Sequence, residues 1–188
     1  MKKIFAILLT VAMLCSMTAC QNASSSGQND DKFVVGVCQL APHDALDAAT
    51  KGFIDTLKKE LGEDKVEVKV ELGGGDTATC TPIVNAFVSE GVDLIMANAT
   101  PALLAAANAT DKIPVLGTSV TDYKATFAGN IPANVSGTSD AVPFAEQAQM
   151  MIDTLNLVSG DKVGVLYCIN ESNSKIQYEA VKALFEEK

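Results

Sequence analysis

Residues 92–102 constrain the fold of this chain more than any other stretch, because they indicate a buried strand that turns directly into a helix. The apolar run 94–96 is typical of a parallel strand that is covered on both faces. Thr100 is a favoured N-cap residue and Pro101 suits the first helical position, so a helix is predicted to continue over 102–109. Such a turn presents free N–H groups at the carboxyl edge of a sheet, where open α/β proteins bind ligands. An ordinary turn with a water at the helix cap would show the same pattern.

Similar strand and helix patterns alternate on both sides of this stretch. Strands are predicted where short apolar or alternating runs occur, and helices where apolar residues recur at a helical spacing. The predicted strands are 33–38, 66–71, 92–98 and 113–117, and the helices between them have apolar positions in 46–61, 83–88 and 102–109. Four strands that alternate with three helices predict a doubly wound parallel sheet, an α/β fold. Glycine-containing residues 129–137 are interpreted as an irregular crossover out of this first lobe.

The remaining chain predicts the opening of a second α/β unit. An amphipathic helix is expected over 144–155 and a strand over 162–167. The strand is followed by a polar stretch and a last helix, whose start is predicted at Ser174 because Ser174 and Gln177 form a capping-box pattern.

The N-terminal residues are predicted to be a targeting signal. Two lysines precede the apolar stretch 4–17, which is too short and too interrupted for a membrane-spanning helix. The stretch ends in Met-Thr-Ala-Cys, which resembles a lipobox with Cys20 as the lipidated residue. We therefore expect a lipoprotein signal peptide at 1–19 and a flexible polar tether at 20–31. A plain secretory signal with an accidental cysteine is the alternative.

The charge balance excludes one class of partner. The 188-residue chain has a formal net charge of −9 and contains no arginine. Removal of residues 1–19 takes away two lysines and no acid, which changes the charge to −11. An acidic domain without arginine argues against binding of nucleic acid, because little would neutralise the phosphates. In binding an anionic small molecule, helix N-termini and hydroxyl groups would do more of the work than usual.

The cysteines do not indicate a metal site. Of the five cysteines, Cys38, Cys80 and Cys168 remain after the signal and the lipidation site, and no pair has the spacing of a metal site. With only one histidine, His43, a zinc site is not expected. We interpret the three cysteines as small packing residues and predict neither a metal nor a cofactor.

Five motifs in order resemble one protein family. They comprise Gln39 with 43–49, 93–95 with 99–102, 113–115 with 120–122, 134–137, and 163–167 with 171–174. Together they are similar to the tryptophan/tyrosine-type ABC transporter substrate-binding lipoproteins over residues 33–188. The sequence departs from the family at Asp44 and Tyr123, where the family usually has proline. Both positions lie in proposed ligand loops, so the ligand need not be the family's usual one.

The resemblance implies a type I periplasmic-binding fold, with two Rossmann-like lobes and a ligand cleft between them. Residues 32–137 would form the N-terminal lobe, and 138–188 the start of a second lobe that we expect to be incomplete. The implied function is the extracytoplasmic substrate-binding component of an ABC importer, anchored to the membrane through its N-terminal lipid. Its implied partners are a small solute, an amino acid and possibly an aromatic one, and an ABC permease.

The turns suggest roles for the candidate site residues. A ligand carboxylate would be held by Thr100, by the helix start at Pro101 and Ala102, and by Thr121. Residues of the second lobe would close on the ligand, an acid would pair with its ammonium, and apolar groups would flank its side chain. The second-lobe residues are Ser172, Asn173 and Ser174, and the candidate acids are Asp76, Asp122 and Glu171. The apolar groups are Leu46, Tyr123 and Tyr167. The resemblance adds Gln39 and His43.

Alternatives remain open for these residues and for the function. Asp122 and Glu171 could cap helices or be solvated, and the tyrosines could be core residues. A lipoprotein that feeds a membrane sensor would have the same sequence pattern. A racemase-like enzyme is a further alternative, in which Cys38 and Cys168, both predicted at strand ends, would act as acid and base.

Overall fold

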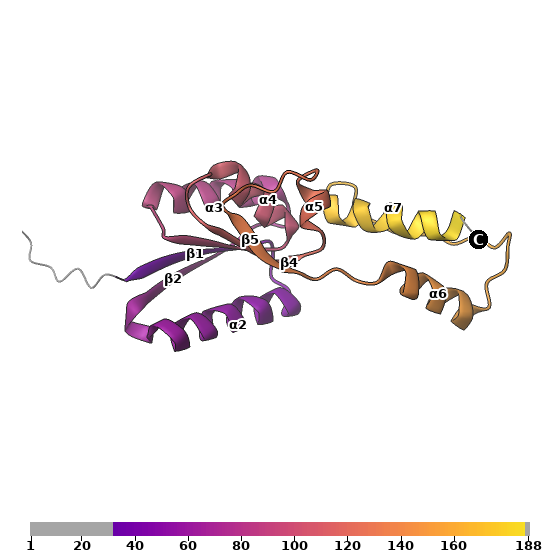
Figure 1. Ribbon diagram of the computed structural model, residues 1–188, viewed down its shortest axis with the longest axis horizontal. Coiled ribbons are helices and arrows are strands. Elements are labelled where there is room, and N and C mark those ends of the chain that lie inside the picture. Colours follow the sequence, from indigo (N-terminus) through magenta and orange to yellow (C-terminus); the bar gives the residue numbers. More distant parts are fainter. Residues whose placement is uncertain (1–31, 187–188) are drawn as a thin grey trace, which may run out of the picture. The chain divides into compact units, whose positions relative to one another are not determined.

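A parallel sheet with helices on both faces is the centre of this computed structural model, which describes residues 32–186 (Figure 1). The predicted signal, lipid site and tether at 1–31 lie outside the described residues. In chain order the elements are β1 Phe33–Gln39, α2 Asp44–Leu61, η1 Glu63–Lys65, β2 Val66–Leu72, α3 Thr77–Glu90, β3 Leu94–Asn98, α4 Thr100–Ala109, β4 Val115–Val120, α5 Tyr123–Thr126, β5 Val135–Ser139, α6 Phe144–Leu155 and α7 Ser172–Glu186.

The sheet has the order β2-β1-β3-β4-β5, and every neighbouring pair is parallel. β3 lies in the centre, and all five of its residues are buried, as predicted for the stretch that contains it. β2 is an edge strand whose later residues are exposed. The chain moves outward from β1 to β2 and in the opposite direction from β3 to β5, so the strand order reverses between β1 and β3. Ligands of open α/β sheets bind at such a switch point, beyond the carboxyl ends of the strands.

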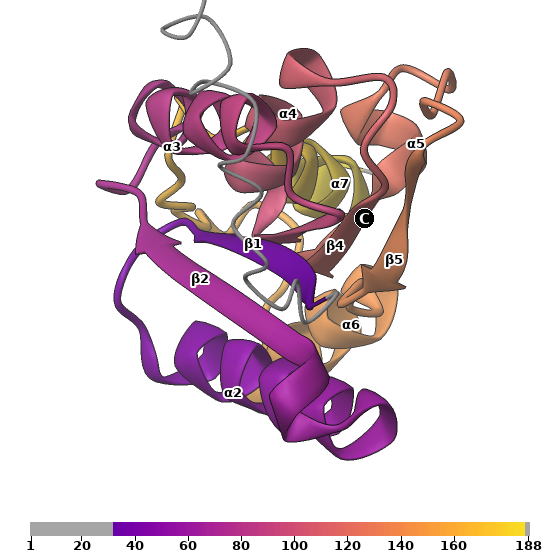
Figure 2. The same cartoon turned by 90° about the vertical axis from the view of Figure 1, so that its left-hand side faces the viewer.

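Two apolar cores cover the two faces of the sheet. On one face Phe53 and Leu57 of α2 pack against Val35, Val37 and Met96 of the strands. On the other face the buried residues of α3 and α4 pack against the strands in a larger cluster. Figure 2 shows the sheet between α2 and the pair α3 and α4. This arrangement confirms the doubly wound α/β prediction and directs the starts of α2 and α4 toward the carboxyl edge of the sheet.

Two predictions about strands are wrong. The stretch predicted as an irregular crossover at 129–137 contains the start of β5, which adds a fifth strand to the edge at β4. The predicted strand at 162–167 is not formed, and Leu166 near its end is fully exposed. A strand needs a neighbour to satisfy its backbone groups, and in the described part of the chain 162–167 pairs with none.

The two late helices, α6 and α7, pack against each other, and α7 also contacts α4 and α5. Figure 1 shows α7 beginning beside α5. None of the helices within residues 32–186 is long and apolar enough to cross a bilayer.

Candidate functional site

Buried polar side chains from β1, α2, β3 and the start of α4 lie at the carboxyl ends of β1 and β3. We call them the switch-point network: Gln39, Thr50, Asn98 and Thr100. Gln39 and Asn98 are paired in the register of β1 and β3. The Gln39 amide nitrogen donates to Asp47 Oδ1 at 2.6 Å, and its oxygen accepts from Thr50 Oγ1 at 2.7 Å. The Asn98 amide nitrogen donates to Thr50 Oγ1 at 2.9 Å and to the Leu46 carbonyl at 2.8 Å. These bonds connect α2 to the switch point and fix the orientation of both amides.

Two atoms at the end of β3 lack a hydrogen-bond partner. Asn98 is fully buried and Thr100 is 1% exposed, yet Asn98 Oδ1 and Thr100 Oγ1 have no partner. A buried polar atom without a partner costs about 1–3 kcal/mol, so such atoms call for an explanation. Asn98 offers an acceptor, and Thr100 offers a hydroxyl that can donate. The site is therefore complementary to a ligand that has both a donor and an acceptor.

The start of α4 is also free to bind a ligand. The predicted capping by Thr100 is wrong: Ala99 occupies the N-cap position, no side chain caps the helix, and Thr100 is its first residue. Ala99 has φ = 93°, a conformation that is rare for residues other than glycine and that is concentrated at functional sites. The hydroxyl of Thr100 is consequently not used by its own helix. Pro101 and Ala102 follow as buried residues of the first turn.

The first turn of α7 brings a second set of unpartnered atoms. Ser172 Oγ and Asn173 Oδ1 are buried and have no partner. Gln177 of the same helix donates to Thr121 Oγ1 at 3.4 Å, which connects α7 to the end of β4. In the described part of the chain, the only unpartnered buried side-chain atoms belong to Asn98, Thr100, Ser172 and Asn173. Asn98 and Thr100, at the end of β3 and the start of α4, and Ser172 and Asn173, at the start of α7, thus lie on elements that meet at the carboxyl edge of the sheet.

Two of the candidate acids, Asp76 and Asp122, cap helices with their carboxylates. Asp76 caps α3 by accepting from Thr79 N at 2.8 Å in a capping box, and Asp122 caps α5 by accepting from Ala125 N at 2.9 Å. His43 caps α2, because its Nδ1 accepts from Ala45 N at 3.2 Å. The capping alternative for Asp122 is thereby confirmed. The Glu171 carbonyl accepts from Lys175 N at 3.1 Å, just before α7.

Tyr123 packs against the sheet. Its hydroxyl donates to the Thr138 carbonyl at 3.3 Å and lies against Gly117 and Gly137, which are paired on β4 and β5. Burial, together with the negative charge of Asp140, raises the pKa of Tyr123 to about 12. The ring of Tyr123 also contacts the larger core cluster, in agreement with the packing alternative.

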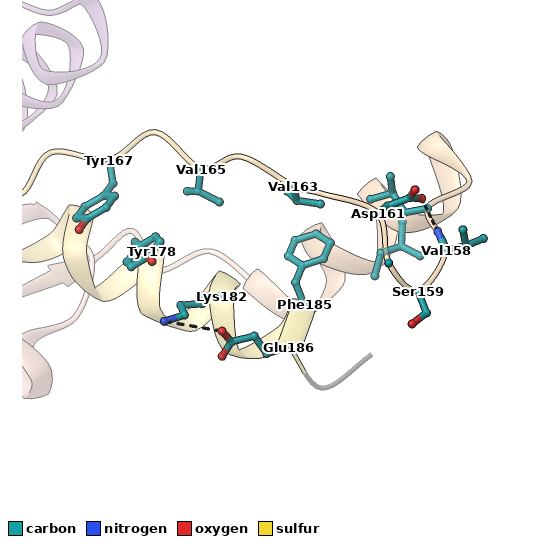
Figure 3. Close-up of a pocket in the computed structure, with 13 residues that line it drawn as sticks. Val158, Ser159, Asp161, Val163, Val165, Tyr167, Tyr178, Lys182, Phe185 and Glu186 are labelled. Atoms are coloured by element: carbon teal, nitrogen blue, oxygen red, sulfur yellow. Dashed lines mark hydrogen bonds and ion pairs between the residues drawn. The ribbon is translucent and has the colours of Figure 1, made fainter.

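Tyr167 lies beside a cavity of about 850 Å³ that is lined only by residues between 152 and 186 (Figure 3). Its ring stacks on Tyr178, with ring centroids 4.2 Å apart. The charged residues of this cavity are already engaged, because Lys182 pairs with Glu186 and Asp161 accepts from Val158 N. The cavity lacks the unpartnered groups of the switch-point network, so we interpret it as loose packing between helices rather than as a ligand site.

Two further predictions about residues of this region are wrong. Ser174 does not start the last helix, which begins at Ser172, and its hydroxyl accepts from Cys168 N at 2.9 Å. The interpretation of Cys168 as a packing residue is wrong, because Cys168 is exposed, whereas Cys38 is fully buried in the larger core cluster, as predicted. The pairing of Cys38 with Cys168 that a racemase-like enzyme would require is therefore not formed. Within residues 32–186, no group of three or more His, Cys, Asp or Glu residues could hold a metal ion.

Sequence reasoning missed Asn98 and Thr50. Asn98 ends an otherwise apolar buried strand at the edge where ligands bind, and this placement was a signal that could have identified it. Thr50 lies within a helix with no such signal. Of the predicted site residues, Gln39 and Thr100 belong to the network. Leu46, Pro101 and Ala102 lie next to it.

Comparison with known proteins gives consistent matches. The family described as "ABC transporter substrate binding protein" matches residues 34–188. A tyrosine-binding protein of Clostridioides difficile is 36% identical over 96% of this chain and 56% of its own length. An ABC domain from Streptococcus pneumoniae, solved in complex with L-Trp, is 32% identical with a TM-score of 0.75 over 83% of this chain and 54% of that chain. A ligand-free, open substrate-binding protein from Clostridium difficile is 33% identical with a TM-score of 0.61 over the same shares. The chain spans just over half the length of these relatives.

Proposed function

Because this chain belongs to the ABC transporter substrate-binding protein family, a family of binding proteins and not of enzymes, we propose that it contributes one lobe and the start of a second to a receptor for an amino acid. The receptor holds the amino acid between its lobes and delivers it to an ABC permease. The single observation that carries the proposal is the restriction of unpartnered buried atoms to Asn98, Thr100, Ser172 and Asn173 among the described residues.

The chemistry of these atoms supports a zwitterionic ligand. The Thr100 hydroxyl and the uncapped start of α4 suit a carboxylate, since helix N-termini attract anions. Asn98 Oδ1 suits the ligand ammonium, because the opposite end of that amide already donates two hydrogen bonds. Ser172 and Asn173 would contact the ligand from α7. This arrangement needs no arginine, in agreement with a chain that has none.

An aromatic ligand side chain is the finer part of the proposal. The relatives from Clostridioides difficile and Streptococcus pneumoniae are described as binding tyrosine and L-Trp. Leu46 is the best-placed of the three apolar candidates, because its carbonyl accepts from Asn98 and its side chain is only partly buried. Tyr123 and Tyr167 would have to leave their present packing to contact a ligand.

Thr100→Val tests the site in a protein that carries this chain and both lobes. Calorimetry should show a roughly ten- to hundredfold loss of affinity for tyrosine or tryptophan, because one charge-assisted hydrogen bond is lost. The ligand-free protein should not lose stability, since the substitution removes a buried hydroxyl that has no partner. If Thr100 had only a structural role, Thr100→Val would lower the stability and leave the affinity unchanged.

Thr100→Ser is the matched control for this substitution, because it keeps the hydroxyl and should keep the affinity within severalfold. Asn98→Leu is expected to weaken binding as well, but also to destabilise the fold, since it breaks the two hydrogen bonds that the Asn98 amide donates. Unchanged affinity in Thr100→Val would contradict the proposed carboxylate site.

We further propose that the mature protein is anchored to the membrane through lipid on Cys20, with residues 1–19 removed. The Lys-Lys start, the short apolar stretch and the Met-Thr-Ala-Cys sequence support this proposal. Cys20→Ser should move the protein from the membrane fraction to the soluble extracytoplasmic fraction in cell fractionation. Cys15→Ser, inside the predicted signal, is the control and should leave the protein in the membrane fraction. A Cys20→Ser variant that stays with the membrane would contradict the lipid anchor.

A further inference from the structure

Two thiols that the proposed ligand site does not use lie together in the larger core cluster. Cys38 is on β1 and Cys80 is in the first turns of α3, and both are fully buried. Both are free cysteines, and both belong to one contiguous cluster of packed buried side chains. They are separated by β2 and α2 in sequence, so a bond between them would close a long loop.

The local backbone positions Cys80 against the end of β1. The capping box of Asp76 and Thr79 fixes the first turn of α3 directly before Cys80. Gly73 passes beside the thiol, because a Cβ built on Gly73 would come within 2.5 Å of Cys80 Sγ and 3.1 Å of the Leu40 carbonyl. The Gly73 N–H donates to the Gln39 carbonyl at 2.7 Å, which holds this turn on the residue that follows Cys38. The absence of a side chain at Gly73 thus leaves the space that the Cys80 sulfur occupies.

We propose that Cys38 and Cys80 form a disulfide bond in the mature protein. The proposal rests on the extracytoplasmic location that the family implies, because disulfides persist outside the reducing cytoplasm. One thiol loses its proton and attacks a disulfide oxidant such as oxidised glutathione, releasing one glutathione thiolate. The second thiol loses its proton, attacks the mixed disulfide and releases the second thiolate. Cys38 and Cys80 are oxidised, and one oxidised glutathione is reduced to two molecules of glutathione.

The bond would form before the core closes. The neighbouring Cys80 thiol and burial raise the pKa of Cys38, whereas Cys38 lowers the pKa of Cys80, so Cys38 is the thiol that stays protonated in the folded protein. Both sulfurs are also inaccessible to an oxidant once the core is packed. Oxidation must therefore accompany export and folding. Cys168 is an unsuitable partner, because it is exposed outside this cluster, just before α7.

The disulfide would stabilise the wall of the ligand site. It would join β1, directly before Gln39 of the switch-point network, to the start of α3. Closing a loop of this length limits the unfolded chain more than the folded one. We expect the oxidised protein to melt about 5–15 °C above the same protein after reduction.

Peptide mapping of exported protein tests the proposal. The full chain is exported to a bacterial periplasm, its free thiols are blocked with N-ethylmaleimide in denaturant, and it is digested without reductant. The expected result is a cross-linked peptide pair that contains Cys38 and Cys80, two hydrogens lighter than the separate peptides. Cys168→Ser should retain this pair, and Cys80→Ala should instead yield a maleimide-labelled Cys38.

Maleimide on both Cys38 and Cys80 of the wild-type protein would overturn the proposal, and so would a link from either one to Cys168. The melting comparison uses oxidised and reduced samples of the same protein, so no cavity from a substitution affects it. Neither readout depends on a ligand. Failure of the disulfide is therefore distinguishable from failure of the proposed amino-acid site.

Discussion

Hydrogen exchange of this chain is expected to show at least about a thousandfold greater protection for the amides of β3 than for those of residues 163–167. β3 is hydrogen-bonded to β1 on one side and to β4 on the other, and all its side chains are buried. Residues 163–167 have no strand partner in the described part of the chain, and their apolar side chains are exposed. Mass-spectrometric exchange with pepsin digestion provides the measurement.

α7 supplies an internal reference for this experiment. Its amides have helical hydrogen bonds but few buried contacts, so they should exchange at rates between those of β3 and 163–167. The amide of Cys168, which donates to Ser174 Oγ, should exchange more slowly than its neighbours. Protection of 163–167 equal to that of β3 in a monomer would show that this stretch forms a paired strand, and would contradict the structure described above.

Gly137→Ala is expected to destabilise the fold by about 2–5 kcal/mol, among the largest effects of any single methyl group in this chain. A Cβ built on Gly137 would lie 2.0 Å from the Gly117 carbonyl oxygen and 2.2 Å from the Tyr123 hydroxyl. Gly137 also has φ = 149°, in the region that favours glycine. Relief would require β5 to separate from β4 at a point where the strands are paired. Urea unfolding followed by circular dichroism measures the loss.

Two other glycines separate the causes of this effect. Gly129 has φ = 86° but open space around its Cβ position, so Gly129→Ala should cost only about 1 kcal/mol through backbone strain. Gly164 has open space and no positive φ, so Gly164→Ala should be nearly neutral. Adding Tyr123→Phe to Gly137→Ala should recover part of the stability, because it removes one of the two clashing oxygens. A Gly137→Ala protein as stable as Gly164→Ala would contradict the close contact of β4 and β5.

The apolar runs and helical periods of this chain were sufficient to predict β1–β4 and the helices between them. The run 94–96 is buried on both faces, and β2, whose sequence alternates valine with charged residues, lies at the edge of the sheet. Gly62, a residue type that favours helix ends, is the C-cap of α2 with φ = 100°. These features depend on local conformational preferences and burial, which a single sequence records directly.

Other features were decided only by tertiary contacts. β5 is mostly Ser, Gly and Thr with one buried valine, so it is a strand because the edge of β4 is available to pair with it. Residues 162–167 have the composition of a strand and remain unpaired, because a ladder requires a neighbour. In the site, the sequence alone identified the exit of β3 and Thr100 as a candidate ligand group. That Thr100 keeps its hydroxyl free, and that Asn98 has an unused acceptor, depends on which hydrogen bonds form across α2, β1 and β3, and those contacts exist only in the folded molecule.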